Sequence, residues 1–98
     1  MTLEELRRHK PQIEAIAAKY GVSNLRVFGS VLRGEVHAHS DLDLLARMPG
    51  EERRYTLFDH VRLKRELAET LNTEVDLVND RCLHKYIGPY ILREAVPL

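Results

Sequence analysis

The stretch GSVLRGEVHAHSDLDLL, residues 29–45, decides how this sequence can fold. It opens with a Gly-Ser pair, crosses a polar loop, and ends in a short apolar run that carries two aspartates, Asp41 and Asp43. Because strand side chains alternate between the two faces of a sheet, we expect the leucines of DLDL to point into the core and the aspartates away from it. Two carboxylates so close together repel each other, so we expect a further interaction that offsets this repulsion.

The sequence before this stretch predicts helix and then strand. Thr2 followed by Glu5 fits a capping box at the start of a helix. Pro11 either interrupts that helix or begins a second one that runs to Tyr20 and is ended by Gly21. A strand is then predicted over residues 25–28, before the Gly-Ser pair.

The sequence after the Gly-Ser pair continues the alternation. Strands are predicted over 41–46 and 74–78, a short helix over 30–33, and a mostly helical segment over 82–95 that is broken at Gly88-Pro89. The clearest helix spans 55–71, and its apolar face is predicted to consist of Phe58, Val61, Leu67, Ala68 and Leu71.

This order of elements predicts one domain over residues 1–98, of the α/β (α+β) class, with a small mixed sheet flanked by helices. Lys plus Arg and Asp plus Glu both number 15, so the zero net charge argues against a long nucleic-acid track. The single cysteine, Cys82, cannot form an internal disulfide, which suits the cytoplasm. The first ten residues lack the apolar core of a signal peptide, and no apolar run is long enough to span a membrane.

The two aspartates are candidate metal ligands. Asp41 and Asp43 are expected to lie roughly 7 Å apart along one strand face. Carboxylate oxygens at this separation suit Mg²⁺, and a pair of such ions would relieve the repulsion between the aspartates. If the strand over 74–78 pairs beside them, Asp76 joins the same face, with Glu74 and Asp80 as nearby alternatives for the third carboxylate.

The Gly-Ser pair is a candidate phosphate site. Gly29 would let a phosphate approach the backbone, and Ser30 would offer a hydroxyl and backbone N–H groups at a helix start. Arg33, one turn further on, could supply positive charge to a triphosphate tail. Ser40 could either contact phosphate or only shape the turn into the strand.

The combination of Gly29-Ser30, Asp41-Leu42-Asp43 and a later Asp76 resembles the nucleotidyltransferase core of the DNA polymerase beta superfamily. The sequence is most similar to the minimal nucleotidyltransferase (MNT) proteins, whose motif reads GSxxRGxxxxxSDxDL. Gly29, Ser30, Arg33, Gly34, Ser40, Asp41, Asp43 and Leu44 all match that motif. The resemblance covers nearly the whole chain.

The resemblance implies a function. It implies binding of ATP with Mg²⁺ by these residues, and transfer of AMP to a tyrosine of a small helical HEPN ribonuclease, with this chain as the antitoxin of a two-gene module. Asp76 would help to deprotonate the incoming hydroxyl. Two alternatives stay open: a non-catalytic antitoxin that neutralises its partner by occlusion, and a nucleotidyltransferase with a small-molecule acceptor.

Overall fold

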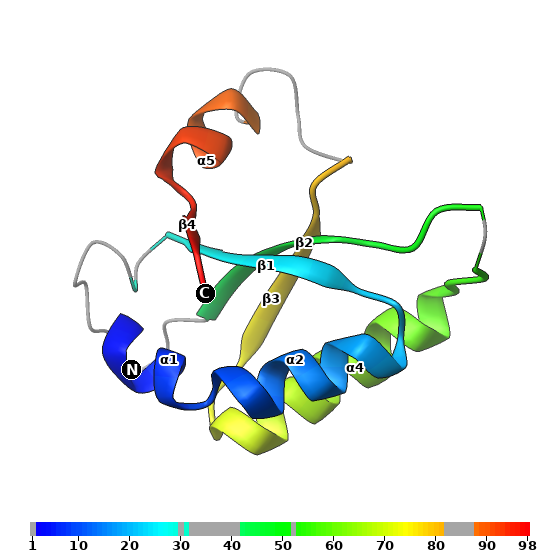
Figure 1. Ribbon diagram of the computed structural model, residues 1–98, viewed down its shortest axis with the longest axis horizontal. Coiled ribbons are helices and arrows are strands. Elements are labelled where there is room, and N and C mark those ends of the chain that lie inside the picture. Colours follow the sequence, from blue (N-terminus) through cyan, green and yellow to red (C-terminus); the bar gives the residue numbers. More distant parts are fainter. Residues whose placement is uncertain (1, 30, 32–41, 52, 82–87) are drawn as a thin grey trace.

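The computed structural model describes residues 2–29, 31, 42–51, 53–81 and 88–98 (Figure 1). In chain order the elements are α1 (Leu3–Arg8), α2 (Lys10–Lys19), β1 (Ser23–Phe28), β2 (Leu42–Arg47), α4 (Leu57–Leu71), β3 (Val75–Asn79), α5 (Gly88–Glu94) and β4 (Val96–Pro97). Of the short helix predicted over 30–33, only Val31 is described; it is helical and packs against the core. No helix among the described residues has both the length and the apolar character needed to cross a membrane.

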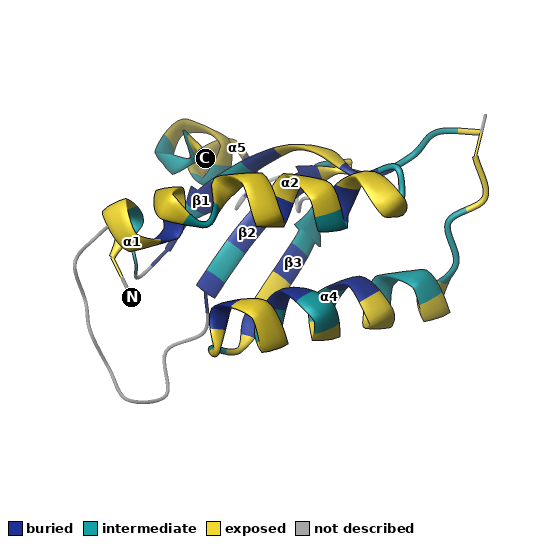
Figure 2. Ribbon diagram, turned by 60° about the horizontal axis from the view of Figure 1, so that its bottom comes forward, coloured by how far each residue is buried: buried dark blue, intermediate teal, exposed yellow. Residues whose placement is uncertain are grey.

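The four strands form one mixed sheet in the order β3-β2-β1-β4. β2 lies antiparallel to β1 and parallel to β3, and β4 lies antiparallel to β1. Helices α2 and α4 run side by side across one face of this sheet, and α5 lies apart from them, next to β4 (Figures 1 and 2). The predicted α/β (α+β) class with a small mixed sheet is therefore confirmed.

The core lies between this sheet and the helices. Alternate strand residues face the helices and are buried, while the residues between them lie on the opposite side of the sheet, which we call the far face. The buried residues of this core are Leu6, Ile13, Ala17, Val22, Leu25, Val27, Leu42, Leu44, Ala46, Met48, Leu63, Leu67, Leu71, Val75, Leu77 and Leu98.

Side-chain caps determine where two of the helices begin. The Thr2 hydroxyl accepts a hydrogen bond from the Glu5 N–H at 3.1 Å, as predicted. At α4, Thr56 and Asp59 form a complete capping box, so this helix begins at Leu57 rather than at Tyr55. Each cap pairs backbone N–H groups that have no partner inside the helix.

The apolar face predicted for α4 is wrong in part. Phe58 and Val61 are 78% and 48% exposed, whereas Leu63, which the prediction omitted, is fully buried. Each helical residue turns the side chain by roughly 100°, so Leu63 lies in line with the buried Leu67 and Leu71, and Phe58 points roughly 140° away from Leu63. The sequence carries two apolar stripes on this helix, and only one of them faces the sheet.

This difference can be tested by two truncations on the same helix. Leu67→Ala should lower the free energy of unfolding by about 2 to 5 kcal/mol, because Leu67 is fully buried and its removal leaves a cavity. Phe58→Ala should change that free energy by less than about 0.5 kcal/mol, because the ring is mostly exposed. Urea denaturation of both variants measures the difference, and equal losses would place Phe58 in the core after all.

The C-terminal segment differs from the prediction. α5 spans Gly88–Glu94. Residues 82–87 lie outside the described residues, so the predicted helix before Gly88-Pro89 and the break there stay predictions. β4, which was not predicted, pairs Val96 with Val27 and Pro97 with Arg26. A strand of two residues is too short to show an alternating pattern, and Pro97 is acceptable because β4 is an edge strand.

Candidate functional site

Two of the three predicted carboxylates lie side by side on the far face. Asp43 of β2 pairs in parallel register with Asp76 of β3, and on its other side it pairs with Phe28 of β1. The leucines flanking Asp43 are buried on the helix side, so the predicted alternation is confirmed. Neighbouring strands lie about 4.8 Å apart, which places two short acidic side chains within reach of one cation.

The two carboxylates differ in exposure. The Asp43 side chain is partly buried between β1 and β3, whereas Asp76 is exposed on the edge strand. Carboxylate oxygens are the hard donors that Mg²⁺ prefers. Because Asp76 is exposed, an ion held there would remain accessible to a substrate. Asp41 lies outside the described residues, and the residues that are described hold no cluster of three metal-ligating side chains. The assignment of Asp41 as a metal ligand stays a prediction.

Gly29 lies directly against Asp43. Its φ is +80°, a backbone conformation that favours glycine. A Cβ at this position would lie 3.0 Å from Asp43 Cγ and 3.2 Å from Asp43 Cβ, and closer still to the Oδ2 oxygen. The absence of a side chain at Gly29 therefore makes room for the Asp43 carboxylate. The predicted approach of a phosphate to Gly29 stays a prediction. Ser30, Arg33 and Ser40 lie outside the described residues.

An ion pair on the same face was not predicted. Arg26 of β1 donates from Nη2 to Asp80 Oδ2 at 2.8 Å, and the two side chains are only 15% and 17% exposed. Asp80 had been considered only as an alternative to Asp76. No short sequence pattern could have paired residues 54 positions apart, because the contact depends on the strand order.

Tyr55 and His60 form a pair at the start of α4, and His60 also interacts with the β3 backbone at Leu77. Tyr55 Oη lies 3.0 Å from His60 Nδ1, and the two rings meet edge to face at 87°. Burial lowers the pKa of His60, and the charge of Lys64 acts in the same direction; a backbone hydrogen bond with Leu77 and the charge of Asp76 oppose them. Burial also raises the pKa of Tyr55 to about 12. Both members of the pair are therefore neutral at neutral pH.

The lowered pKa of His60 predicts a loss of stability in acid. The unfolded chain has the ordinary histidine pKa of about 6.5, so below that pH it binds protons more readily than the folded state does. This contribution to stability is complete above about pH 6.5 and is lost as the pH falls through the folded pKa. Melting temperatures between pH 7.5 and pH 5 should fall more steeply for the wild type than for His60→Gln, and parallel curves would exclude this role.

Comparison with known proteins assigns the family. The model of the nucleotidyltransferase domain family matches residues 9–96, most of the chain. The chain belongs to the nucleotidyltransferase domain family. The predicted class of enzyme, a nucleotidyltransferase, is thereby confirmed, and Asp43, Asp76 and Gly29 form the described part of its candidate active site.

Similar proteins share this family. The Methanocaldococcus jannaschii protein MJ0435, named as a protein adenylyltransferase, is 40% identical over 96 residues, which cover 98% of this chain and 97% of that protein. The protein adenylyltransferase MntA of Thermococcus cleftensis is 35% identical over 100 residues, with 98% and 95% coverage.

Solved structures show the same fold. One described as a minimal nucleotidyltransferase has a TM-score of 0.82 and 43% identity, and the match covers 100% of this nucleotidyltransferase and 97% of that chain. A solved complex of a tri-AMPylated Shewanella oneidensis HEPN toxin with an MNT antitoxin matches with a TM-score of 0.67 and 16% identity, covering 93% of this chain and 69% of that one. At 16% identity, the similarity to this antitoxin shows a shared fold and nothing about function.

Proposed function

We propose that this nucleotidyltransferase is a protein adenylyltransferase that transfers AMP from ATP to a tyrosine of a HEPN-type helical toxin and so acts as an antitoxin in the cytoplasm. The observation that carries the proposal is the register of Asp43 with Asp76 beside Gly29, in a family member whose similar proteins are named protein adenylyltransferases. The HEPN partner is suggested by the fold shared with an MNT antitoxin solved together with such a toxin.

The acidic residues would hold the metal of this reaction. Asp41, Asp43 and Asp76 are the proposed ligands, and Mg²⁺, when bound, would neutralise phosphate charge around the reacting phosphorus. Asp43, partly buried and fixed between two strands, is suited to a constant position. Asp76, exposed on the edge strand, is suited to meet the acceptor.

The remaining residues would orient the substrates. Ser30, Arg33 and Ser40 are proposed to contact the triphosphate, as the resemblance to MNT proteins implies. The tyrosine oxygen would attack the α-phosphorus of ATP, a new P–O bond would form, and the bond to the β-phosphate would break to release pyrophosphate. Asp76 would receive the proton of the tyrosine hydroxyl, which makes the oxygen a better nucleophile.

Incubation with α-labelled ATP, Mg²⁺ and the product of the neighbouring gene tests the proposal. The label is expected on the partner, on a tyrosine, and only with Mg²⁺ present. Tight binding of the partner without label would favour neutralisation by occlusion. Label on a small-molecule acceptor but not on the partner would favour the other alternative.

A further inference from the structure

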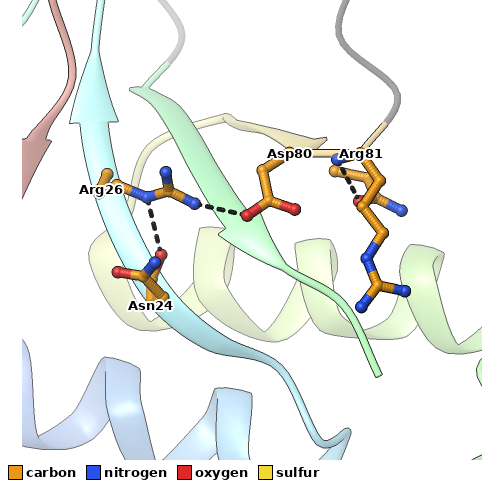
Figure 3. A network of polar contacts seen from close by, with 5 residues as sticks. Asn24, Arg26, Asp80 and Arg81 are labelled. Carbon is orange, nitrogen blue, oxygen red and sulfur yellow. Dashed lines mark hydrogen bonds and ion pairs between the residues drawn. The ribbon is translucent and has the colours of Figure 1, made fainter. Parts of the chain in front are cut away.

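The Arg26–Asp80 ion pair crosses β2, one of the two interior strands of the sheet. Arg26 lies on β1 and Asp80 directly follows β3, so the contact spans β2 on the far face (Figure 3). Beneath it lies Leu45, which pairs with Arg26 in register and is fully buried although it faces away from the main core. The pair therefore joins two strands that do not neighbour each other and helps to keep water from Leu45.

Both ends of this pair are held by further contacts. Arg26 Nε donates to the Asn24 carbonyl at 3.1 Å, at a point where the β1–β2 register shifts and where Asn24 has a left-handed φ of 52°. The Asp80 N–H donates to the Ala46 carbonyl at 2.9 Å, which extends the β2–β3 ladder by one residue. The second oxygen of Asp80 is buried and has no hydrogen-bond partner among the described residues. Because Arg26 donates to both the Asn24 carbonyl and the Asp80 carboxylate, its guanidinium is held in one orientation.

This arrangement bears on the candidate active site because β3 is an edge strand. Among the strands that the structure describes, β3 pairs with β2 alone, and Asp76 stands four positions before Asp80 on the same face. We propose that Arg26 and Asp80 are positioning residues, which tie the end of β3 to β1 across β2 and thereby fix Asp76 beside Asp43. The importance of this position rests on the proposed function, since misplacement of a reacting group by about 1 Å can cost about a hundredfold in rate.

A positioning role can be separated from a stabilising one. Buried ion pairs replaced by apolar residues of similar volume are often neutral for stability. Arg26→Met combined with Asp80→Leu should therefore still cover Leu45 and melt within a few degrees of the wild type. The matched control is Arg8→Met with Glu4→Leu, which removes an ion pair whose side chains are 71% and 84% exposed.

Two measurements on these variants decide the proposal. Amide hydrogen exchange over residues 75–79 should be about tenfold faster in the Arg26/Asp80 variant, a readout that needs no activity. Turnover with the partner should fall about tenfold with an unchanged KM for ATP, whereas the control should match the wild type in both measurements. If the double variant does not fold, Arg26→Lys replaces it, since an ammonium lacks the fork that reaches Asn24 and Asp80 together; the expected changes are then about threefold.

The outcomes separate the two proposals. A folded variant with wild-type exchange over 75–79 and wild-type turnover would overturn the positioning role and leave the pair as a cover for Leu45. Faster exchange in a system where even the wild type transfers no AMP would support the positioning of β3 while refuting the adenylyltransferase. Unchanged exchange with reduced turnover would also overturn the proposal, because β3 would then not have moved.

Discussion

Exchange of Asp41 and Asp43 together for asparagine is expected to lower AMP transfer at least about a thousandfold, since asparagine keeps the volume but not the charge that holds a divalent cation. The fold should survive, because Asp43 lies on the far face and the leucines beside it remain in the core. Without Mg²⁺ the melting temperature should stay equal or rise, because repulsion between carboxylates is removed. Initial rates with labelled ATP and thermal melts measure both effects.

The matched control for this variant is Glu74→Gln. It removes one exposed carboxylate directly before β3, outside the proposed ligand set. It should leave both rate and melting temperature unchanged. Transfer at the wild-type rate by the Asp41/Asp43 variant would refute the metal assignment, and a large loss with Glu74→Gln would move the third ligand to Glu74.

Gly29→Ala is expected to lower both stability and turnover. The new Cβ would collide with the Asp43 carboxylate, and the φ of +80° strains any residue with a side chain. We expect a loss of about 1 to 3 kcal/mol in the free energy of unfolding and a loss of about a hundredfold in turnover, because Asp43 must move. Gly29→Val should be worse in both respects.

Gly21→Ala separates backbone strain from damage to the site. Gly21 has a similar φ of +71°, but a Cβ there would meet the side chains of Arg53 and Pro49 rather than Asp43. It should lose stability and keep its turnover per folded molecule. Urea denaturation gives the folded fraction by which rates are corrected. Equal corrected rates for the two alanine variants would remove Gly29 from the site.

Alternation and capping, which act over a few residues, made much of this fold predictable. Leu42 and Leu44 lie in the core, as alternate positions on a strand predict. Alternation also placed Asp43 and Asp76 on one face on the condition that their strands pair, and β2 does pair with β3. Thr2 begins the first helix because its hydroxyl reaches a residue three positions later. Such patterns assign residues to the core or to a face of the sheet, but they do not determine which strands are neighbours.

The features that were missed depend on contacts between distant segments. Phe58 is apolar and has helical spacing, yet it is exposed, because the sequence does not say which of two stripes faces the sheet. β4 is too short to carry a pattern of its own. The ion pair between Arg26 and Asp80 exists only because β1 and β3 flank β2. Strand order, not local periodicity, brings these residues together.

Intact mass spectrometry of the HEPN-type partner, purified after co-expression with the wild type or with Asp76→Ala, tests the central claim most directly. The wild type is predicted to leave AMP on a partner tyrosine. Asp76→Ala should bind the partner and leave it unmodified, because the carboxylate proposed to accept the proton is gone and the surface outside the site is unchanged. A partner without any adduct, yet neutralised equally by both proteins, would contradict the enzymatic account.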